Sequence, residues 1–321
     1  MARILVTGAA GFIGRALCRE LVRRGHVVRG LTRGTGPPIA GVVLDAIGEI
    51  GPRTSWGGRL DRVDVIIHLA TRAHRPMAAE DANHEAEAAA ILARAAAAAG
   101  VGRLVHVSSI RAMGAATAPG TRFRPGDPAR PADPYGRAKL AIERALAAAA
   151  RDCGLDLVIL RPPLVHGPGV KGNLASLIRL VASGLPLPFA RIDNRRSLIF
   201  LDSLLDLLAI ACTHRAAPGR VLLARDPADL STPQLIGALA AGLGRAPRLV
   251  AVPAAALAAL ARLPALGPVL MRLTASLQAD DEETRRVLGW SPGTTSEAGL
   301  AATARFYARQ RRDGRVGGVV P

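Results

Sequence analysis

Short apolar runs alternate with longer helical segments through the first half of this chain, and this order constrains the fold more than any other feature. Each run has four to eight residues. Continuous apolar runs of this length are typical of strands that are buried on both faces of a sheet. Because helix-length segments separate them, we predict an α/β fold with a doubly wound parallel sheet. The predicted strands are residues 3–7, 27–32, 42–45, 63–69, 104–108 and 155–160, and the predicted helices are 15–24, 83–99 and 134–152.

The pattern changes after Arg161, where prolines and glycines introduce a loop-rich stretch. Beyond it we predict strands at 197–201, 221–224 and 249–252, and helices at 174–183, 202–213 and within 253–277. A smaller second region over one end of the sheet would account for this change. The predicted division is 1–168 for the dinucleotide-binding domain, with 196–224 returning to it, 169–195 and 225–309 for a substrate-binding region, and 310–321 for a frayed tail.

Composition excludes several classes of protein. Half of the 321 residues are apolar, which is too many for a disordered chain. Three cysteines without a CxxC or metal spacing argue against a disulfide framework and fit a reducing compartment. Prolines and arginines interrupt the longest apolar stretch, 249–277, so a membrane span is not expected. We predict a soluble cytoplasmic protein, with a helix lying on a membrane surface in that stretch as a minor alternative.

A glycine-rich turn, TGAAGFIG at 7–14, follows the first predicted strand and opens the first helix. Its glycines, Gly8, Gly11 and Gly14, allow a tight turn and let the backbone approach a pyrophosphate at the helix N-terminus. The motif alone would be weak in a chain with 34 glycines. Its position between a strand and a helix nevertheless predicts a dinucleotide site.

The end of the second predicted strand indicates which dinucleotide binds. An NAD site usually has Asp or Glu there, which accepts a hydrogen bond from the ribose 2′-OH. Residues 26–44 contain no acid, and Thr32-Arg33 occupies the expected place, with Arg29 nearby. A guanidinium can pair with a 2′-phosphate through its planar fork. We therefore predict a preference for NADP(H). The alternatives are that the site binds NAD(H), and that Arg33 is only a solvated residue of the surface.

Tyr135 and Lys139 are four residues apart at the start of a predicted helix, so they share one helical face. A nearby ammonium stabilises phenolate, which predicts a lowered pKa for Tyr135 and proton exchange with a hydroxyl or carbonyl. In a chain with only two tyrosines and two lysines, such a pair rarely arises by chance. Ser109 follows the fifth predicted strand, at the edge where parallel sheets gather ligands.

Together these motifs resemble the extended short-chain dehydrogenase/reductase family, specifically its nucleotide-sugar epimerases, dehydratases and reductases. The resemblance implies a catalytic triad of Ser109, Tyr135 and Lys139, and a structural Asn at Asn83, at a helix start. His166 stands where the family commonly has Tyr. The resemblance covers nearly the whole chain and includes the segments VIIHLAT at 65–71, RPPLVHGPG at 161–169 and LGW at 288–290.

The resemblance also implies further contacts to the dinucleotide. Lys139 holds the nicotinamide ribose, Asp45 with Ala46 lies near adenine, and Thr71 replaces a usual Ala beside the nicotinamide. No metal is implied. The cofactor residues that we predict are Gly8, Gly11, Phe12, Ile13, Gly14, Thr32, Arg33, Asp45, Ala46, Leu69, Ala70, Thr71, Tyr135, Lys139 and Pro162.

Substrates of the family are nucleoside-diphosphate sugars, often UDP-linked. By resemblance, Asn173 lies in the segment that meets the sugar diphosphate, and Arg196 is the arginine that clamps it. Ser109 and Arg111 are further substrate candidates, and Arg272 is a weaker candidate for the nucleotide end. The resemblance also implies a homodimer that forms through two helices of each subunit.

Two reactions compete. In the reductase, NADPH reduces a keto carbon of the sugar, which we expect to be C4, and Tyr135 supplies the proton. In the 4-epimerase, NAD⁺ takes and returns hydride at C4. The absent ribose-binding acid favours the reductase, as does the likeness of SSIRAMG, RPPLVHGPGVKGN and NRRSL to reductases of 4-keto-6-deoxy-N-acetylated UDP-sugars. A dehydratase is disfavoured because Ile110-Arg111 stands where those enzymes carry an Asp-Glu pair.

Two non-enzymatic functions are the alternatives to an enzyme. A redox-silent NADP(H) sensor would keep the glycine-rich turn but would not need Ser109, Tyr135 and Lys139 together. A nucleic-acid binder would explain the net charge of +17. However, the chain has no basic-aromatic platform, and its arginines are scattered over many elements. Both functions are therefore less favoured than an enzyme.

Overall fold

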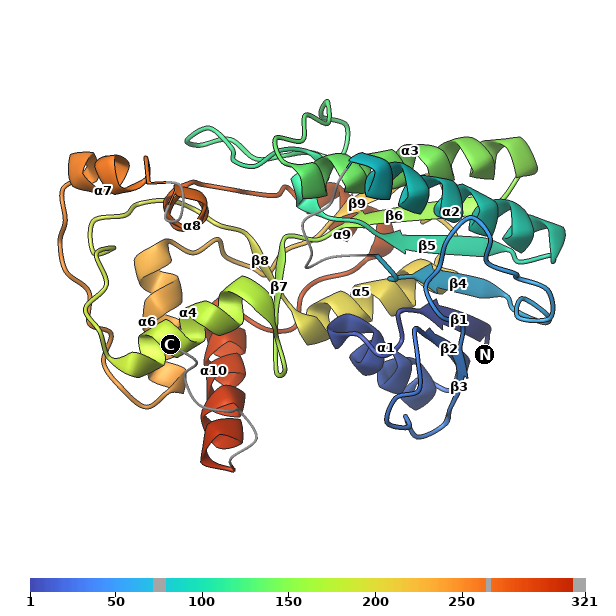
Figure 1. Ribbon diagram of the computed structural model, residues 1–321, viewed down its shortest axis with the longest axis horizontal. Helices are drawn as coiled ribbons and strands as arrows, with labels where there is room; N and C mark the ends of the chain where they lie inside the picture. Colours follow the sequence, from blue (N-terminus) through green and yellow to red (C-terminus); the bar gives the residue numbers. More distant parts are fainter. Residues whose placement is uncertain (72–78, 264–266, 314–321) are drawn as a thin grey trace.

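A seven-stranded parallel sheet in the order β3-β2-β1-β4-β5-β6-β9 organises the protein (Figure 1). The computed structural model describes residues 1–71, 79–263 and 267–313. The strand order reverses between β1 and β4, and ligands of open α/β sheets bind outside the carboxyl ends of the strands at such a point. The strands are β1 Arg3–Thr7, β2 Val27–Thr32, β3 Val42–Ala46, β4 Val65–His68, β5 Arg103–Val107, β6 Asp156–Arg161 and β9 Val221–Leu223.

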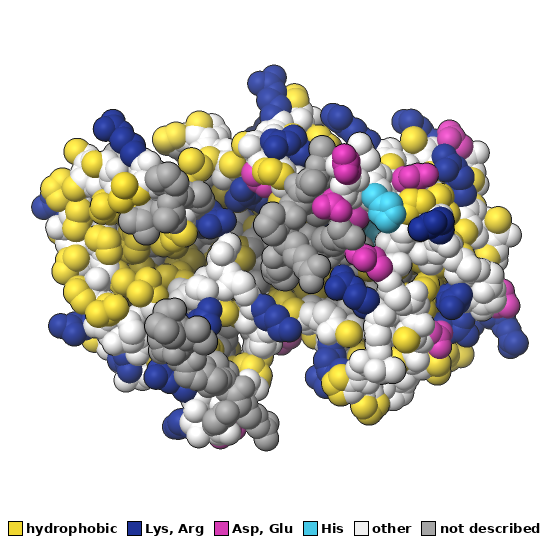
Figure 2. All heavy atoms as spheres, viewed as in Figure 1, with side chains coloured by type: hydrophobic (Ala, Val, Ile, Leu, Met, Phe, Trp, Pro, Cys, Tyr) yellow, Lys and Arg dark blue, Asp and Glu magenta, His cyan; other side chains and the backbone are white. Residues whose placement is uncertain are grey.

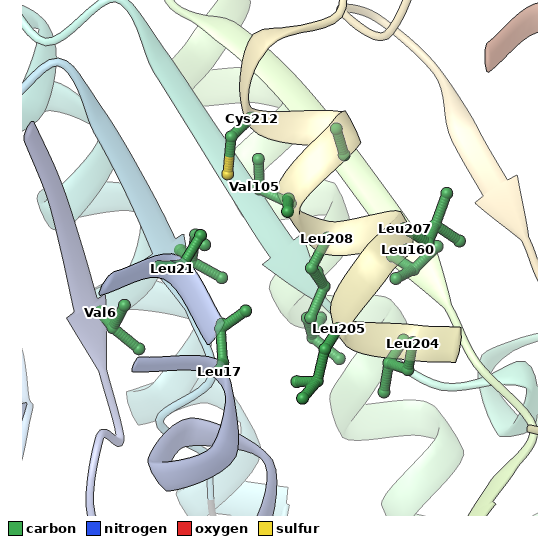
Figure 3. Packing of buried hydrophobic residues seen from close by; sticks show 14 of the residues in the cluster. Val6, Leu17, Leu21, Val105, Leu160, Leu204, Leu205, Leu207, Leu208 and Cys212 are labelled. Atoms are coloured by element: carbon green, nitrogen blue, oxygen red, sulfur yellow. The ribbon is translucent and has the colours of Figure 1, made fainter. Parts of the chain in front are cut away.

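Helices cover both faces of this sheet, so the predicted doubly wound α/β fold is confirmed. α2 (Ala79–Ala98) and α3 (Pro134–Cys153) pack together on one face. α1 (Phe12–Arg23) and α5 (Leu201–Thr213) cover the other. Figure 3 shows the leucines of α5 and α1 directed onto side chains of the sheet. This packing explains why the sheet strands read as continuous apolar runs.

The rest of the chain builds a second lobe beyond the carboxyl ends of the strands (Figure 1). Its short parallel pair joins β7 (Leu164–His166) to β8 (Leu198–Phe200). A separate apolar cluster holds the lobe together, with side chains from several of its helices. The remaining helices are α4 Gly172–Ser183, α6 Thr232–Gly242, α7 Ala254–Leu260, α8 Gly267–Thr274, α9 Glu282–Leu288 and α10 Ser296–Arg312.

Most predicted elements occur, with boundaries shifted by a few residues. The strand predicted at 249–252 is wrong: Leu249 forms only an isolated bridge to Leu187, because Pro247 and Pro253 bracket a segment too short to extend a ladder. β7 was not predicted, since it lies in the loop-rich stretch. The tail predicted from 310 begins inside α10, and residues 314–321 lie outside the described residues. The division into domains stays a prediction.

No helix among the described residues has the length and apolar character that a bilayer crossing requires.

Candidate functional site

The glycine-rich turn joins β1 to α1 at the point where the strand order reverses. Gly8 has a left-handed φ of +70°, and a Cβ on Gly14 would lie 2.2 Å from the Gly8 carbonyl oxygen. The Thr7 hydroxyl accepts hydrogen bonds from the amides of Leu69 and Ala70, both at 3.1 Å, and so fixes the end of β4 beside the turn. A backbone cradle this close, at the N-terminus of a helix, fits a dinucleotide pyrophosphate.

A cavity of about 260 Å³ opens over this turn. Its walls also include three titratable side chains that were not predicted from the sequence, namely Glu49, His68 and Glu85. Of the predicted cofactor residues, those that line it are Gly8, Gly11, Thr32, Arg33, Leu69, Ala70 and Thr71.

The adenosine end of the cavity differs from the prediction in two respects. Asp45 and Ala46 are not among the described residues that line the cavity. Residues 47–50 line it instead. Arg29, expected near a 2′-phosphate, instead forms a 3.7 Å ion pair with Asp45. Arg33 remains at the end of β2, and Glu49 lines the same cavity from the segment after β3.

The Tyr/Lys pair lies in the first turns of α3, next to this cavity. Lys139 is 4% exposed, and its Nζ donates to the Thr71 hydroxyl (2.8 Å) and the Val107 carbonyl (3.2 Å). The same Nζ lies 5.8 Å from the centre of the Tyr135 ring. Ser109 follows β5, and its hydroxyl hydrogen-bonds with that of Tyr135. The three predicted catalytic side chains are therefore close together, beside the cavity wall formed by Thr71.

Burial dominates the protonation of these groups. It raises the pKa of Tyr135 above its usual value, against the opposing effect of the Ser109 hydrogen bond. The prediction of a lowered Tyr135 pKa is therefore wrong, because the cost of removing a phenolate from water outweighs its stabilising neighbours. Burial also lowers the pKa of Lys139 to about 8, although Glu85 and Glu143 act in the opposite direction.

A buried ion pair supports the helix that carries Tyr135 and Lys139. Glu143 on α3 accepts from Arg161 at the end of β6, with Nη2 to Oε2 at 2.6 Å, and these side chains are 3% and 7% exposed. The Ser108 hydroxyl donates to the same carboxylate. Since Glu143 is four residues after Lys139, it shares that helical face, and this spacing was the signal available in the sequence.

A second ion pair ties the loop of Ser109 to the start of α3. Asp133 caps the helix by accepting from the Gly136 amide at 3.0 Å, and Arg111 donates to the same carboxylate through Nε at 2.9 Å. Asp133 has a lowered pKa, because these hydrogen bonds outweigh its burial. Arg111 thus positions Asp133 and the turn that carries Tyr135, and its predicted contact with substrate stays a prediction.

Close packing at Gly136 leads to a testable prediction. A Cβ there would lie 2.2 Å from the Arg111 carbonyl oxygen. We expect Gly136→Ala to lower the free energy of unfolding by about 1–3 kcal/mol, because α3 must move away from the Ser109 loop. Urea denaturation measures this change. Gly237→Ala is the control: Gly237 lies within α6 with open space around it, so alanine should stabilise by about 0.5–1 kcal/mol. An equal, stabilising effect of both substitutions would contradict the proposed contact.

Three of the predicted substrate residues converge on one place. Burial lowers the pKa of Arg196 to about 10, and the positive charges of Arg111 and Arg272 lower it further. Arg196 is held in place because its backbone bridges Leu230 and Leu277. No carboxylate in the described part of the chain forms an ion pair with Arg196, whose Nη1 donates to the Ala275 carbonyl at 3.0 Å. Arginines arranged in this way suit the oxygens of a phosphate group.

The remaining predicted residues lie elsewhere. Asn173 is exposed in the first turn of α4. Asn83 is the fifth residue of α2, not its start, and is exposed, because a helical first turn with Glu80 and Asp81 precedes it. His166 is fully buried, with its Nε2 2.9 Å from the Asp226 carboxylate, so it joins β7 to the segment after β9.

Gly14, Phe12 and Ile13 belong to the first turn of α1 and its packing, and they are not among the residues that line the cavity. Pro162 accepts from the Ile110 amide at 3.0 Å and so supports the Ser109 loop. A larger hollow of about 550 Å³ lies between α4, α6 and α10, and it contains none of the predicted site residues.

Comparison with known proteins agrees with this geometry. The model of the NAD dependent epimerase/dehydratase family matches residues 4–224. The chain is 35% identical over 313 residues to a UDP-glucose 4-epimerase of Vibrio cholerae, covering 95% of each chain. It is 29% identical over 261 residues to a 2-alkyl-3-oxoalkanoate reductase of Stenotrophomonas maltophilia (strain K279a), covering 77% of each.

A solved structure of MoeE5 in complex with UDP-glucuronic acid and NAD has a TM-score of 0.78 and 27% sequence identity, covering 96% of this chain and 99% of that chain. The family match spans the whole sheet together with the turn at Gly8 and the Tyr135/Lys139 pair. The chain belongs to the NAD-dependent epimerase/dehydratase family of extended short-chain dehydrogenases, a family of nucleotide-sugar enzymes.

Proposed function

We propose that this protein reduces the 4-keto group of a UDP-linked 6-deoxy-N-acetylhexosulose to the 4-hydroxy sugar, with NADPH as the reductant. The observation that carries the proposal is the placement of two groups of side chains. Ser109, Tyr135 and Lys139 adjoin the dinucleotide cavity, and Arg196 with its neighbouring arginines offers positive charge to a diphosphate. A sugar that joins these two groups would present a ring carbon to the Ser/Tyr pair.

The chain's own groups account for the proton transfer. The cavity would hold a nicotinamide cofactor, whose chemistry would be transfer of hydride to the keto carbon. Ser109 hydrogen-bonds to the keto oxygen, and Tyr135 donates its phenolic proton to that oxygen as negative charge develops there. Lys139 lies beneath the tyrosine ring, and its positive charge stabilises the phenolate left behind. The raised pKa of Tyr135 keeps the proton on the phenol until the substrate oxygen takes it.

Epimerisation at C4 is the second candidate, and the relative of Vibrio cholerae named a UDP-glucose 4-epimerase favours it. There Tyr135 would first accept the proton of the C4 hydroxyl and later return it. Both reactions use the same three side chains. In the reductase Tyr135 only donates a proton, whereas in the epimerase it first accepts one and then donates it. The difference lies in whether hydride returns to the same sugar and whether the nicotinamide is consumed.

Two parallel incubations separate the candidates. In the first, purified protein is mixed with NADPH and a UDP-4-keto-6-deoxy-N-acetylhexosamine, and the absorbance of NADPH and the configuration of the product are followed. The reductase consumes one NADPH for each 4-hydroxy sugar formed. In the second, the protein is mixed with NAD⁺ and UDP-glucose, and formation of UDP-galactose without net reduction of NAD⁺, together with no consumption of NADPH in the first, would replace the reductase with the epimerase. Neither reaction, in protein that binds NADPH, would support the redox-silent sensor.

The NADP(H) preference rests on Arg33, which lines the cavity at the end of β2. We expect Arg33→Asp to weaken NADPH binding roughly tenfold to a hundredfold, because it removes a charge-assisted bond to the 2′-phosphate and adds a like charge. NADH binding should be unchanged or stronger. Titration of both cofactors by tryptophan fluorescence or calorimetry measures this. Arg53→Asp, on the exposed surface, is the charge-matched control. Equal losses in the two variants would remove Arg33 from the site.

A further inference from the structure

The second lobe is formed largely by two long segments that contain basic residues but no acidic ones. No Asp or Glu occurs between Asp156 and Asp193, or between Asp229 and Asp280, in a chain that has 25 acidic residues. These two segments contain α4, α6, α7 and α8, so the acid-free sequence is concentrated in one lobe. The basic residues within them are Arg161, Lys171, Arg179, Arg191, Arg245, Arg248, Arg262 and Arg272.

The outer side of this lobe is also apolar. Leu257 and Leu270 anchor α7 and α8 in the lobe's apolar cluster, at 4% and 8% exposure. Leu273 of α8 also packs against this cluster, whereas Leu260, Val269 and Met271 on the same two helices are exposed. Figure 2 shows hydrophobic side chains gathered at this end of the molecule, with Lys and Arg at the margins. The exposed large apolar residues are Leu260 (41%), Leu263 (50%), Val269 (45%) and Met271 (61%).

We propose that the α7–α8 face is a docking surface for an anionic lipid bilayer. An exposed apolar patch within a segment that contains arginines and no acids matches the two features of such a bilayer, a hydrocarbon layer under a negative headgroup surface. A second copy of this chain is a poor occupant, since a two-fold interface would bring together two faces that carry the exposed Arg262 and come from a segment without acids.

The lengths of α7 and α8 decide whether they could span a bilayer or only lie on its surface. α7 has seven residues and α8 has eight, whereas a membrane-spanning helix needs about 20. The two helices can therefore only lie in the plane of the interface, with Leu263 and Met271 entering the acyl boundary. Arg262, which directly precedes Leu263, can reach the headgroup phosphates because long basic side chains extend their charge away from apolar contacts. Arg272 on α8 belongs also to the substrate arginines, so the docked face would adjoin the substrate site.

Vesicle flotation with the full-length protein tests this. We expect binding to vesicles that contain phosphatidylglycerol, little binding to pure phosphatidylcholine, and release by salt. The double variant Leu263→Gln/Met271→Gln should bind phosphatidylglycerol vesicles at least about tenfold more weakly. Arg262→Glu should also weaken this binding, because it puts a negative charge beside Leu263 against the anionic headgroups. Val43→Gln is the matched control, because Val43 is a 63% exposed apolar residue on β3, at the other end of the molecule.

Three results would overturn the proposal. One is the absence of binding to anionic vesicles at low salt. Another is equal binding of the wild type and Leu263→Gln/Met271→Gln, which would mean that the net charge of +17 alone attracts the protein. The third is a dimer, seen by sedimentation equilibrium, that this variant dissociates in the absence of any vesicle binding. Circular dichroism of each variant verifies that the fold is kept, and the readout does not depend on the enzymatic activity.

Discussion

Tyr135→Phe is expected to lower kcat roughly 10³-fold, within the range that general acid catalysis contributes. The substitution removes the only proton that the phenol can deliver and keeps the ring that packs over Lys139. The dissociation constant for NADPH should change less than about twofold, because in our proposal Lys139 and the glycine-rich turn hold the cofactor. Stopped-flow absorbance of NADPH gives the rate, and equilibrium titration gives the affinity.

The chain provides its own control for this experiment. Its other tyrosine, Tyr307, lies on α10 beside the larger hollow and away from the dinucleotide cavity. Tyr307→Phe should leave kcat within about twofold of the wild type. If Tyr135→Phe retained more than about a tenth of the wild-type kcat, Tyr135 would not be the proton donor. A large loss in both variants would point instead to a general effect on folding.

The parts of the site that follow local spacing were predictable from the sequence. The turn at 7–14 and the Tyr135/Lys139 pair each lie within one strand–turn–helix or one helical turn, so the order of residues nearly determines their geometry. The sheet was predictable for a similar reason, since its strands are buried on both faces and read as apolar runs. Pairing between distant segments has no such local signal.

Several side chains around the site could therefore not be found. Glu143 meets Arg161 across 18 positions, and Arg111 meets Asp133 across 22. Asp133 could be predicted as a helix cap, but its partner depends on how the Ser109 loop folds back. The predicted direction of the Tyr135 pKa shift was wrong for the same reason. Sequence spacing indicates that Lys139 is near Tyr135, whereas the burial that raises the Tyr135 pKa depends on segments that are distant in the sequence.

Lys139 connects the fold and the chemistry, because its burial makes the folded protein less stable. The Lys139 ammonium has a pKa of about 8 in the fold instead of 10.5. Its charged form is therefore disfavoured on folding, and at pH 7 this costs the fold on the order of 3 kcal/mol. The two hydrogen bonds of Nζ, to Thr71 and Val107, belong to the same buried environment. A residue that destabilises the fold in this way is typical of functional sites.

Lys139→Met should consequently stabilise the protein at pH 7 by about 1–2 kcal/mol, after about 1–2 kcal/mol is subtracted for the acceptors left unpaired. The difference in free energy of unfolding between Lys139→Met and the wild type depends on pH and changes sign at high pH. Below about pH 8 the folded wild type carries the full penalty, and as pH rises from about 8 towards 10.5 the lysine loses its proton more readily in the fold than in the unfolded chain. The wild type therefore gains stability over that window, and the advantage of Lys139→Met should vanish near pH 9.5.

Urea denaturation at pH 7.0 and 9.5 measures both free energies. The same preparations give kcat, which we expect to fall at least about a hundredfold because the phenolate of Tyr135 loses the positive charge that lies 5.8 Å from the centre of its ring. Lys171→Met is the matched control, since the chain's other lysine is exposed before α4 and should show neither effect. A destabilised Lys139→Met whose difference from the wild type stays constant between the two pH values would mean that Lys139 is not a strained ammonium. Stabilisation together with lost activity would show that the buried charge is retained for catalysis at the expense of the fold.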